Sequence, residues 1–112
     1  PQERLRGIVR ASFSAVNFRR EVISAWLNFY VLAQTLPEAK RLLRIYQRRL
    51  HTNLCHDLKK IVGGRADDVA RGLGAVIDGV YIREALKQSS PDGDGAVSMA
   101  LTYLSLELEA RA

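Results

Sequence analysis

Apolar residues recur at intervals of three and four positions along most of this chain, and few stretches alternate between apolar and polar residues. An interval near 3.6 places apolar side chains on one face of a helix, whereas a strand would need an interval of two. The pattern therefore predicts an all-α protein with helices over residues 2–15, 19–35, 37–62, 66–87 and 93–110.

Residues with special backbone properties mark several of the expected helix ends. Pro37 fits the first turn of a helix, where its missing N–H removes no hydrogen bond. Gly63 and Gly64 are expected to end the same helix as a C-terminal glycine cap. In the loop before the last helix, Asp92 or Asp94 is expected to accept a hydrogen bond from a free backbone N–H.

The predicted helices differ in how their apolar residues are distributed. The helix over 19–35 is apolar nearly all round its middle, so we expect it at the centre of the bundle. The helix over 66–87 contains Gly72, Gly74 and Gly79, each of which costs about 1 kcal/mol relative to alanine. Close packing against another helix is expected to offset that cost.

The last predicted helix has an apolar surface too wide to remain uncovered. One stripe contains Val97, Leu101, Leu104 and Leu108, and Ala100, Tyr103 and Leu106 broaden it. We expect a homodimer in which the last two helices of each subunit form a four-helix contact. The residues expected in this interface are Gly72, Gly79, Arg83, Met99, Tyr103 and Leu106.

Length and composition narrow the class of protein. A chain of 112 residues favours one domain spanning residues 1–112. The net charge of +5 is typical of a solvated basic face and less often indicates a polyanion partner. A single Cys55 and the lack of a signal-peptide pattern predict a cytoplasmic setting, and the apolar run over 22–33 is too short to span a membrane.

Two helical segments far apart in sequence suggest a ligand pocket. Trp26, Phe29 and Tyr30 share one helix face, and Asp78 and Tyr81 lie one turn apart on another helix. Together they predict a pocket lined by aromatic rings with one negative charge. Simple core packing is the alternative for the rings, most of all for Phe29. An unpaired Asp78 among apolar neighbours would be costly, so it either pairs with a tyrosine hydroxyl or with Arg83, or it awaits a cation.

Other polar groups give weaker signals. Arg41, Arg44, Arg48 and Arg49 form a basic row, which we interpret as a solvated face although it could meet DNA phosphates. His51, Cys55 and His56 lie close together in sequence but lack a second cluster of ligands, so no metal site is expected. The Asp-x-Asp-Gly run at 92–95 resembles the start of a calcium loop without its remaining ligands.

No combination of the remaining residues predicts catalysis or a cofactor. The chain offers no nucleophile with a base, no phosphate-binding glycine loop and no pair of carboxylates at helical spacing. We therefore expect a protein that is not an enzyme and that uses no cofactor.

Three segments resemble a known family of regulators. Ala-Trp-Leu-x-Phe-Tyr at 25–30, Arg-Arg-Leu-x-x-Asn-Leu at 48–54, and Leu-Gly-Ala-Val-Ile-Asp-Gly-Val-Tyr-Ile-Arg at 73–83 are similar to the BetI subgroup of the TetR family of repressors. The resemblance covers about residues 5–108 and concerns the carboxy-terminal half of such a repressor. It implies a TetR-like helical bundle that binds an effector and dimerises. The resemblance also implies a helix-turn-helix DNA-binding domain upstream of Pro1. The chain opens at Pro1 without an initiator Met, so we expect a fragment or a trimmed product.

The resemblance also implies a ligand and a biological role. In the BetI subgroup the controlled genes convert choline to glycine betaine, and choline is the inducing signal. A quaternary ammonium is held against aromatic faces, so Trp26, Phe29, Tyr30, Asp78 and Tyr81 are the expected effector-binding residues. The alternatives are a TetR-like pocket for another small molecule and a structural dimerisation module without a ligand. The last alternative predicts a filled core between the aromatic helix and the helix of Asp78.

Overall fold

The computed structural model describes residues 2–14, 19–87 and 91–110, and this part of the chain contains helices and no strands. In chain order the elements are α1 (Gln2–Ser12), α2 (Arg20–Leu32), α3 (Pro37–Val62), the short 3₁₀ helix η1 (Gly63–Arg65), α4 (Ala66–Leu86) and α5 (Gly93–Glu109). The predicted all-α class is confirmed. The predicted helix over 2–15 is too long, because α1 ends at Ser12, and residue 15 lies outside the described residues.

The residues expected to set the helix ends do so. Pro37 occupies the first turn of α3, and the backbone of Gly63 adopts a positive φ of 55° directly after that helix. A side chain at Gly63 would be strained in this conformation, so glycine is the residue that allows the chain to leave α3 there. The Asp92 carboxylate accepts a hydrogen bond from the backbone N–H of Gly95 at 3.0 Å and caps α5.

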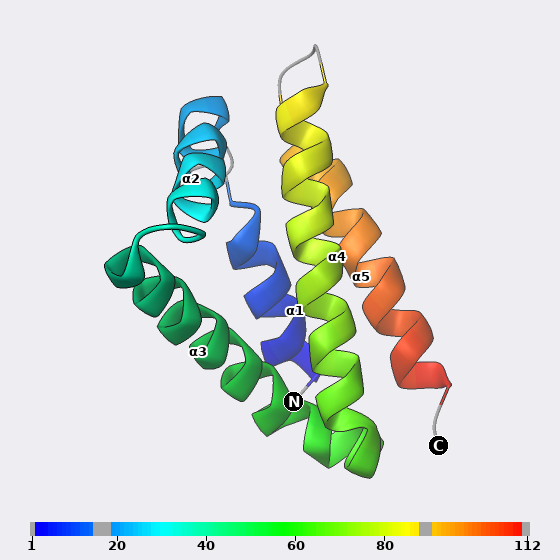
Figure 1. The fold of residues 1–112 in the computed structure, drawn as a ribbon. Helices are drawn as coiled ribbons and strands as arrows, with labels where there is room; N and C mark the ends of the chain where they lie inside the picture. The colour runs from blue at the N-terminus through cyan, green and yellow to red at the C-terminus, as the bar shows by residue number, and fades with distance from the viewer. Residues whose placement is uncertain (1, 15–18, 88–90, 111–112) are drawn as a thin grey trace.

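Helix α4 is the centre of the domain. It packs against α3 on one side and α5 on the other, and it also contacts α2 (Figure 1). Leu73 is fully buried, and Val69, Ala70, Ile77 and Val80 are nearly so. The remaining core comes mainly from α1, α3 and α5, with Ile23 as the contribution of α2. Its largest fully buried apolar side chains are Leu5, Val9, Ile23, Leu54, Leu58 and Leu104.

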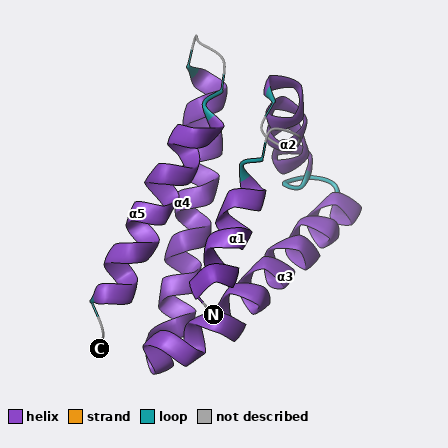
Figure 2. Cartoon of the chain, turned by 180° about the vertical axis from the view of Figure 1, so that it is seen from behind, coloured by secondary structure: helices purple, strands orange, loops and turns teal. Residues whose placement is uncertain are grey.

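The prediction that the helix over 19–35 lies at the centre is wrong. Helix α2 lies beside the upper parts of α3 and α4, away from α5 (Figures 1 and 2). Only Ile23 within it is buried, and Val31 and Leu32 are 63% and 48% exposed. The prediction fails because hydrophobicity alone does not distinguish a residue packed in a core from one that lines an open cavity.

Only one of the three glycines in α4 is in close contact with another helix. A Cβ atom at Gly72 would overlap the hydroxyl oxygen of Tyr103 on α5, whereas Gly74 and Gly79 have open space beside them. The expected close approach therefore occurs at Gly72, within a single chain. No described helix is both long enough and apolar enough to cross a bilayer.

Candidate functional site

The aromatic residues of α2 form the first part of the candidate site. Trp26, Phe29 and Tyr30 lie on one face, as their spacing requires, and all three are half-buried. The ring of Trp26 meets Phe29 edge-on, with centroids 5.9 Å apart and an interplanar angle of 88°, and it lies 6.1 Å from Tyr30. These distances fall in the range of favourable ring contacts, so the three rings pack against one another on α2.

Tyr46 on α3 completes the cluster, and sequence reasoning missed it. Its ring lies 5.1 Å from that of Trp26 at an angle of 42°, and Tyr46 remains 46% exposed. A signal for it was present, because Leu42, Tyr46, Leu50, Leu54 and Leu58 follow one another at intervals of four and mark the inner face of α3. The basic row of the same helix, formed by Arg41, Arg44, Arg48 and Arg49, is exposed to solvent as expected.

An apolar cavity lies between α2 and α3 beside this cluster. Its volume is about 480 Å³, which falls within the usual range for small-molecule sites. The residues around it are Glu21, Val22, Ala25, Trp26, Phe29, Leu42 and Tyr46. Phe29, which the sequence favoured as core, therefore lines a cavity, and Glu21 is the one charged residue among those that line it.

Asp78 lies on α4 at a second cavity of about 340 Å³, which is also lined by Tyr30, Tyr46 and Gly74. The hydroxyl of Tyr30 donates to Asp78 Oδ1 over a long 3.5 Å. Burial raises the pKa of Asp78 above its ordinary value, and the hydrogen bond from Tyr30 opposes that rise only in part. Among the described residues, Asp78 forms no ion pair with a basic side chain, Arg83 included.

The three tyrosines around Asp78 respond to the same surroundings. Burial and the Asp78 carboxylate raise the pKa of Tyr30 and Tyr46, and they raise the pKa of Tyr81 to about 12. All three hydroxyls therefore stay protonated at neutral pH, and those of Tyr30 and Tyr81 act as hydrogen-bond donors. Among the described residues that line this second cavity, Asp78 is the one carboxylate.

Tyr81 makes contacts with the end of α1 as well as lining a cavity beside the aromatic cluster. Its hydroxyl donates to the backbone carbonyl of Ser12, and its ring lies 5.5 Å from that of Phe13. It lines a third cavity of about 410 Å³, together with Trp26 and Tyr46. The predicted site residues are thus distributed over three cavities, and Tyr46 lines all three.

The residues expected in a dimer interface lie on α4 and α5. Met99 and Leu106 are 55% and 61% exposed, and Arg83 is exposed as well. Ile82 and Leu86 of α4 add further exposed apolar surface. Gly79 has open space beside it, whereas Gly72 is covered by Tyr103 of the same chain. The expected interface residues therefore include three exposed side chains and one contact internal to the chain.

The fold also gathers polar side chains that the sequence had left apart. Helix α4 brings Asp67 next to His51 and Cys55 of α3, and this carboxylate was missing from the sequence interpretation. His56 lies outside the group. Burial and the neighbouring Asp67 raise the pKa of the Cys55 thiol, although Lys59 partly opposes this rise.

The chain is similar to one family of proteins and to several of its curated members. A family described as "BetI-type transcriptional repressor, C-terminal" matches residues 1–109. The chain is 47% identical to the HTH-type transcriptional regulator BetI of Brucella canis over 109 residues, which cover 96% of the chain and 55% of the relative. It is 40% identical to the regulator BetI of Rhizobium meliloti over 111 residues, which cover 98% of the chain and 55% of the relative. The chain spans about half the length of these relatives, and no solved structure matches it significantly.

Proposed function

The chain belongs to the BetI-type transcriptional repressors, in the region of their C-terminal domain, and we propose that it senses a small-molecule effector and forms the dimer. The members of this family are transcriptional regulators and not enzymes, which confirms the prediction that this protein is not an enzyme. In this proposal a helix-turn-helix domain upstream binds operator DNA in the cytoplasm. Effector binding alters the spacing of the two DNA-binding domains in the dimer and so changes their affinity for the operator. The genes under this control convert choline to glycine betaine.

The proposed effector is choline or a related quaternary ammonium. Such a cation has no N–H to donate, so it binds best against the faces of aromatic rings, with a carboxylate nearby. The observation that carries the proposal is the contact of Trp26 with Tyr46 across α2 and α3, at a cavity of about 480 Å³. Tyr30 extends from this cluster to the half-buried Asp78, which has no basic partner among the described residues.

The cavities also bear on the two alternative functions. A purely structural module would have a filled core between α2 and α4. The cavity of about 340 Å³ lined by residues of both helices supports the sensing function over that alternative. A TetR-like domain for an uncharged lipophilic effector is favoured by one observation, the apolar lining of the cavity between α2 and α3. We therefore retain this second candidate and test it against the first.

Choline binding is expected to weaken as the pH falls, because a cation needs the ionised form of Asp78. Burial raises the pKa of this carboxyl, so protonation begins at a higher pH than for an ordinary aspartate, and the loss of affinity begins there too. Isothermal titration of the chain with choline over a pH series measures the effect. Asp78→Asn should bind choline more weakly near neutral pH and should lose most of this pH dependence.

The matched ligand control is 3,3-dimethylbutanol, which has the shape of choline without its charge. If choline binds and this neutral compound does not, the proposal that the effector is a quaternary ammonium is supported. Tighter binding of the neutral compound would instead favour the lipophilic effector. Equal pH dependence in Asp78→Asn would refute the role of this carboxylate and leave the aromatic residues as the only recognition elements.

Dimerisation through α4 and α5 is expected to be sensitive to Leu106. Leu106→Asp places a charge on a side chain that is 61% exposed in one subunit and would be buried in the dimer. Sedimentation should show a shift from dimer toward monomer at the same protein concentration. Val31→Asp is the control, because Val31 is 63% exposed on α2, outside the expected interface. A monomeric unmodified chain, or equal dissociation of both variants, would refute this interface.

A further inference from the structure

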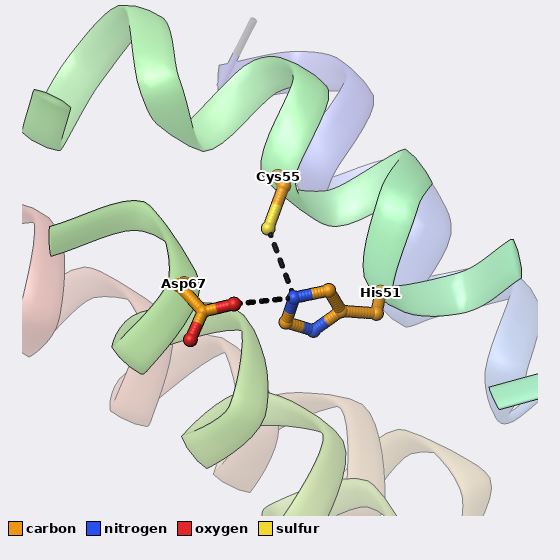
Figure 3. A group of neighbouring side chains, drawn as sticks. All are labelled: His51, Cys55 and Asp67. Carbon is orange, nitrogen blue, oxygen red and sulfur yellow. Dashed lines mark hydrogen bonds and ion pairs between the residues drawn. The ribbon is translucent and has the colours of Figure 1, made fainter. Parts of the chain in front are cut away.

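Three side chains with different donor atoms meet between α3 and α4. His51 Nε2 lies 2.8 Å from Asp67 Oδ1 and 3.4 Å from Cys55 Sγ, and all three atoms lie within 4.8 Å of one another (Figure 3). His51 and Cys55 are one helical turn apart on α3, and both point toward Asp67 on α4 (Figure 3). The group lies at a solvent-accessible cavity of about 510 Å³.

The turn between the two helices creates this group. The positive φ of Gly63 and the short helix η1 reverse the chain, so the first turn of α4 lies beside α3. Asp67 in that turn is then level with His51, which precedes it by sixteen residues. Sequence spacing of His51 and Cys55 alone could not reveal this third side chain.

The geometry does not fit a nucleophilic Cys–His–Asp arrangement. In such an arrangement the acid orients one ring nitrogen of the histidine while the thiol faces the other nitrogen. Here Cys55 and Asp67 both approach the same atom, His51 Nε2. Three donor atoms within 4.8 Å of one another instead suit a shared cation.

We propose that His51, Cys55 and Asp67 bind a divalent transition-metal ion of the Zn²⁺ type. In a tetrahedral zinc site with bonds of about 2.0 Å to N and O and about 2.3 Å to S, neighbouring donor atoms lie about 3.3–3.5 Å apart. The observed separation of 3.4 Å between Sγ and Nε2 already fits, and that of 2.8 Å between Nε2 and Oδ1 must widen by about half an ångström. The open cavity leaves the fourth position to water.

The donor set selects the class of metal. Thiolate and imidazole suit Zn²⁺ and its analogue Co²⁺, whereas Mg²⁺ and Ca²⁺ prefer oxygen donors throughout. Arg71 lies 3.9 Å from Asp67 Oδ2, so it can orient the carboxylate with Oδ1 toward the metal. Without metal, the Cys55 thiol donates to the backbone carbonyl of Ala66 over 3.8 Å.

The test is the stoichiometry and affinity of Zn²⁺ binding by the chain, measured by competition with a chromogenic chelator. We expect one equivalent of Zn²⁺ to bind, with Mg²⁺ and Ca²⁺ unable to compete. Replacing a residue that only orients a metal ligand typically costs about 10- to 100-fold in affinity. His51, Cys55 and Asp67 are the proposed ligands themselves, so His51→Ala, Cys55→Ser and Asp67→Asn should each weaken Zn²⁺ binding by at least about tenfold. Co²⁺ should give a thiolate-to-metal charge-transfer band that Cys55→Ser removes.

His56→Ala is the matched control, because His56 lines the same cavity but lies outside the group of three. It should bind Zn²⁺ as tightly as the unmodified chain. Circular dichroism without metal should be the same for all variants, so weaker binding cannot reflect unfolding. The proposal is overturned if the chain binds no stoichiometric Zn²⁺, if Cys55→Ser keeps full affinity, or if His56→Ala is the variant that loses it.

Discussion

Trp26→Ala is expected to raise the Kd for choline by about tenfold, because a cation–π contact in a partly desolvated site contributes about 1–2 kcal/mol and 1.4 kcal/mol corresponds to a factor of ten. Trp26 is the residue most central to the aromatic group, since its ring contacts those of Phe29, Tyr30 and Tyr46. Isothermal titration at neutral pH measures the change. Trp26→Phe keeps an aromatic face and should recover much of the lost affinity.

Leu42→Ala provides the matched control for the loss of the ring. Leu42 lines the same cavity as Trp26 but has no π system, and it is 59% exposed. Its replacement should change choline affinity much less than Trp26→Ala does. Unchanged affinity in Trp26→Ala would remove Trp26 from the site. Equal losses in both variants would indicate a hydrophobic contact and favour the uncharged effector.

Leu73→Ala should lower the free energy of unfolding by about 2–5 kcal/mol, the usual range for a buried leucine that leaves a cavity. Leu73 is fully buried in α4, the helix that packs against both α3 and α5. The neighbouring helices therefore cannot easily collapse into the space. A loss of this size is a large part of the stability of a small domain. Urea denaturation at a fixed protein concentration measures it, because dimerisation would add to the apparent stability.

The control for this prediction is the same substitution in an exposed leucine. Leu32 at the end of α2 is 48% exposed, so Leu32→Ala should cost less than about 1 kcal/mol. A similarly small effect in Leu73→Ala would contradict the placement of α4 at the centre of the core. A large effect in Leu32→Ala would show that α2 is buried in solution, as the sequence alone had suggested.

Local chemistry explains why the helices could be predicted well. Pro37 starts α3, Gly63 ends it and Asp92 caps α5, and each effect depends on atoms within a few residues of the helix end. Helical periodicity likewise depends only on near neighbours in sequence. Helix bounds were consequently predicted within about three residues for the described helices, with α1 as one of the less accurate cases.

Long-range contacts explain what the sequence did not reveal about the site. Tyr46 had the right spacing to face inward, but only the packing of α2 on α3 shows that it meets Trp26. Asp67 reaches His51 only because the chain turns at Gly63. The partner of Tyr81 is a backbone carbonyl of α1, which carries no side-chain signal at all.

The sequence by itself determined the all-helical class, most helix ends and the family, because these follow from local propensities and from the identities of residues along the chain. Only the tertiary structure decided that α4 rather than α2 is central, that the site residues line three cavities joined at Tyr46, and that a carboxylate joins His51 and Cys55. Those features depend on which surfaces pack against each other. Packing is chosen by the whole chain at once, since burying one apolar face changes which other faces remain open to solvent.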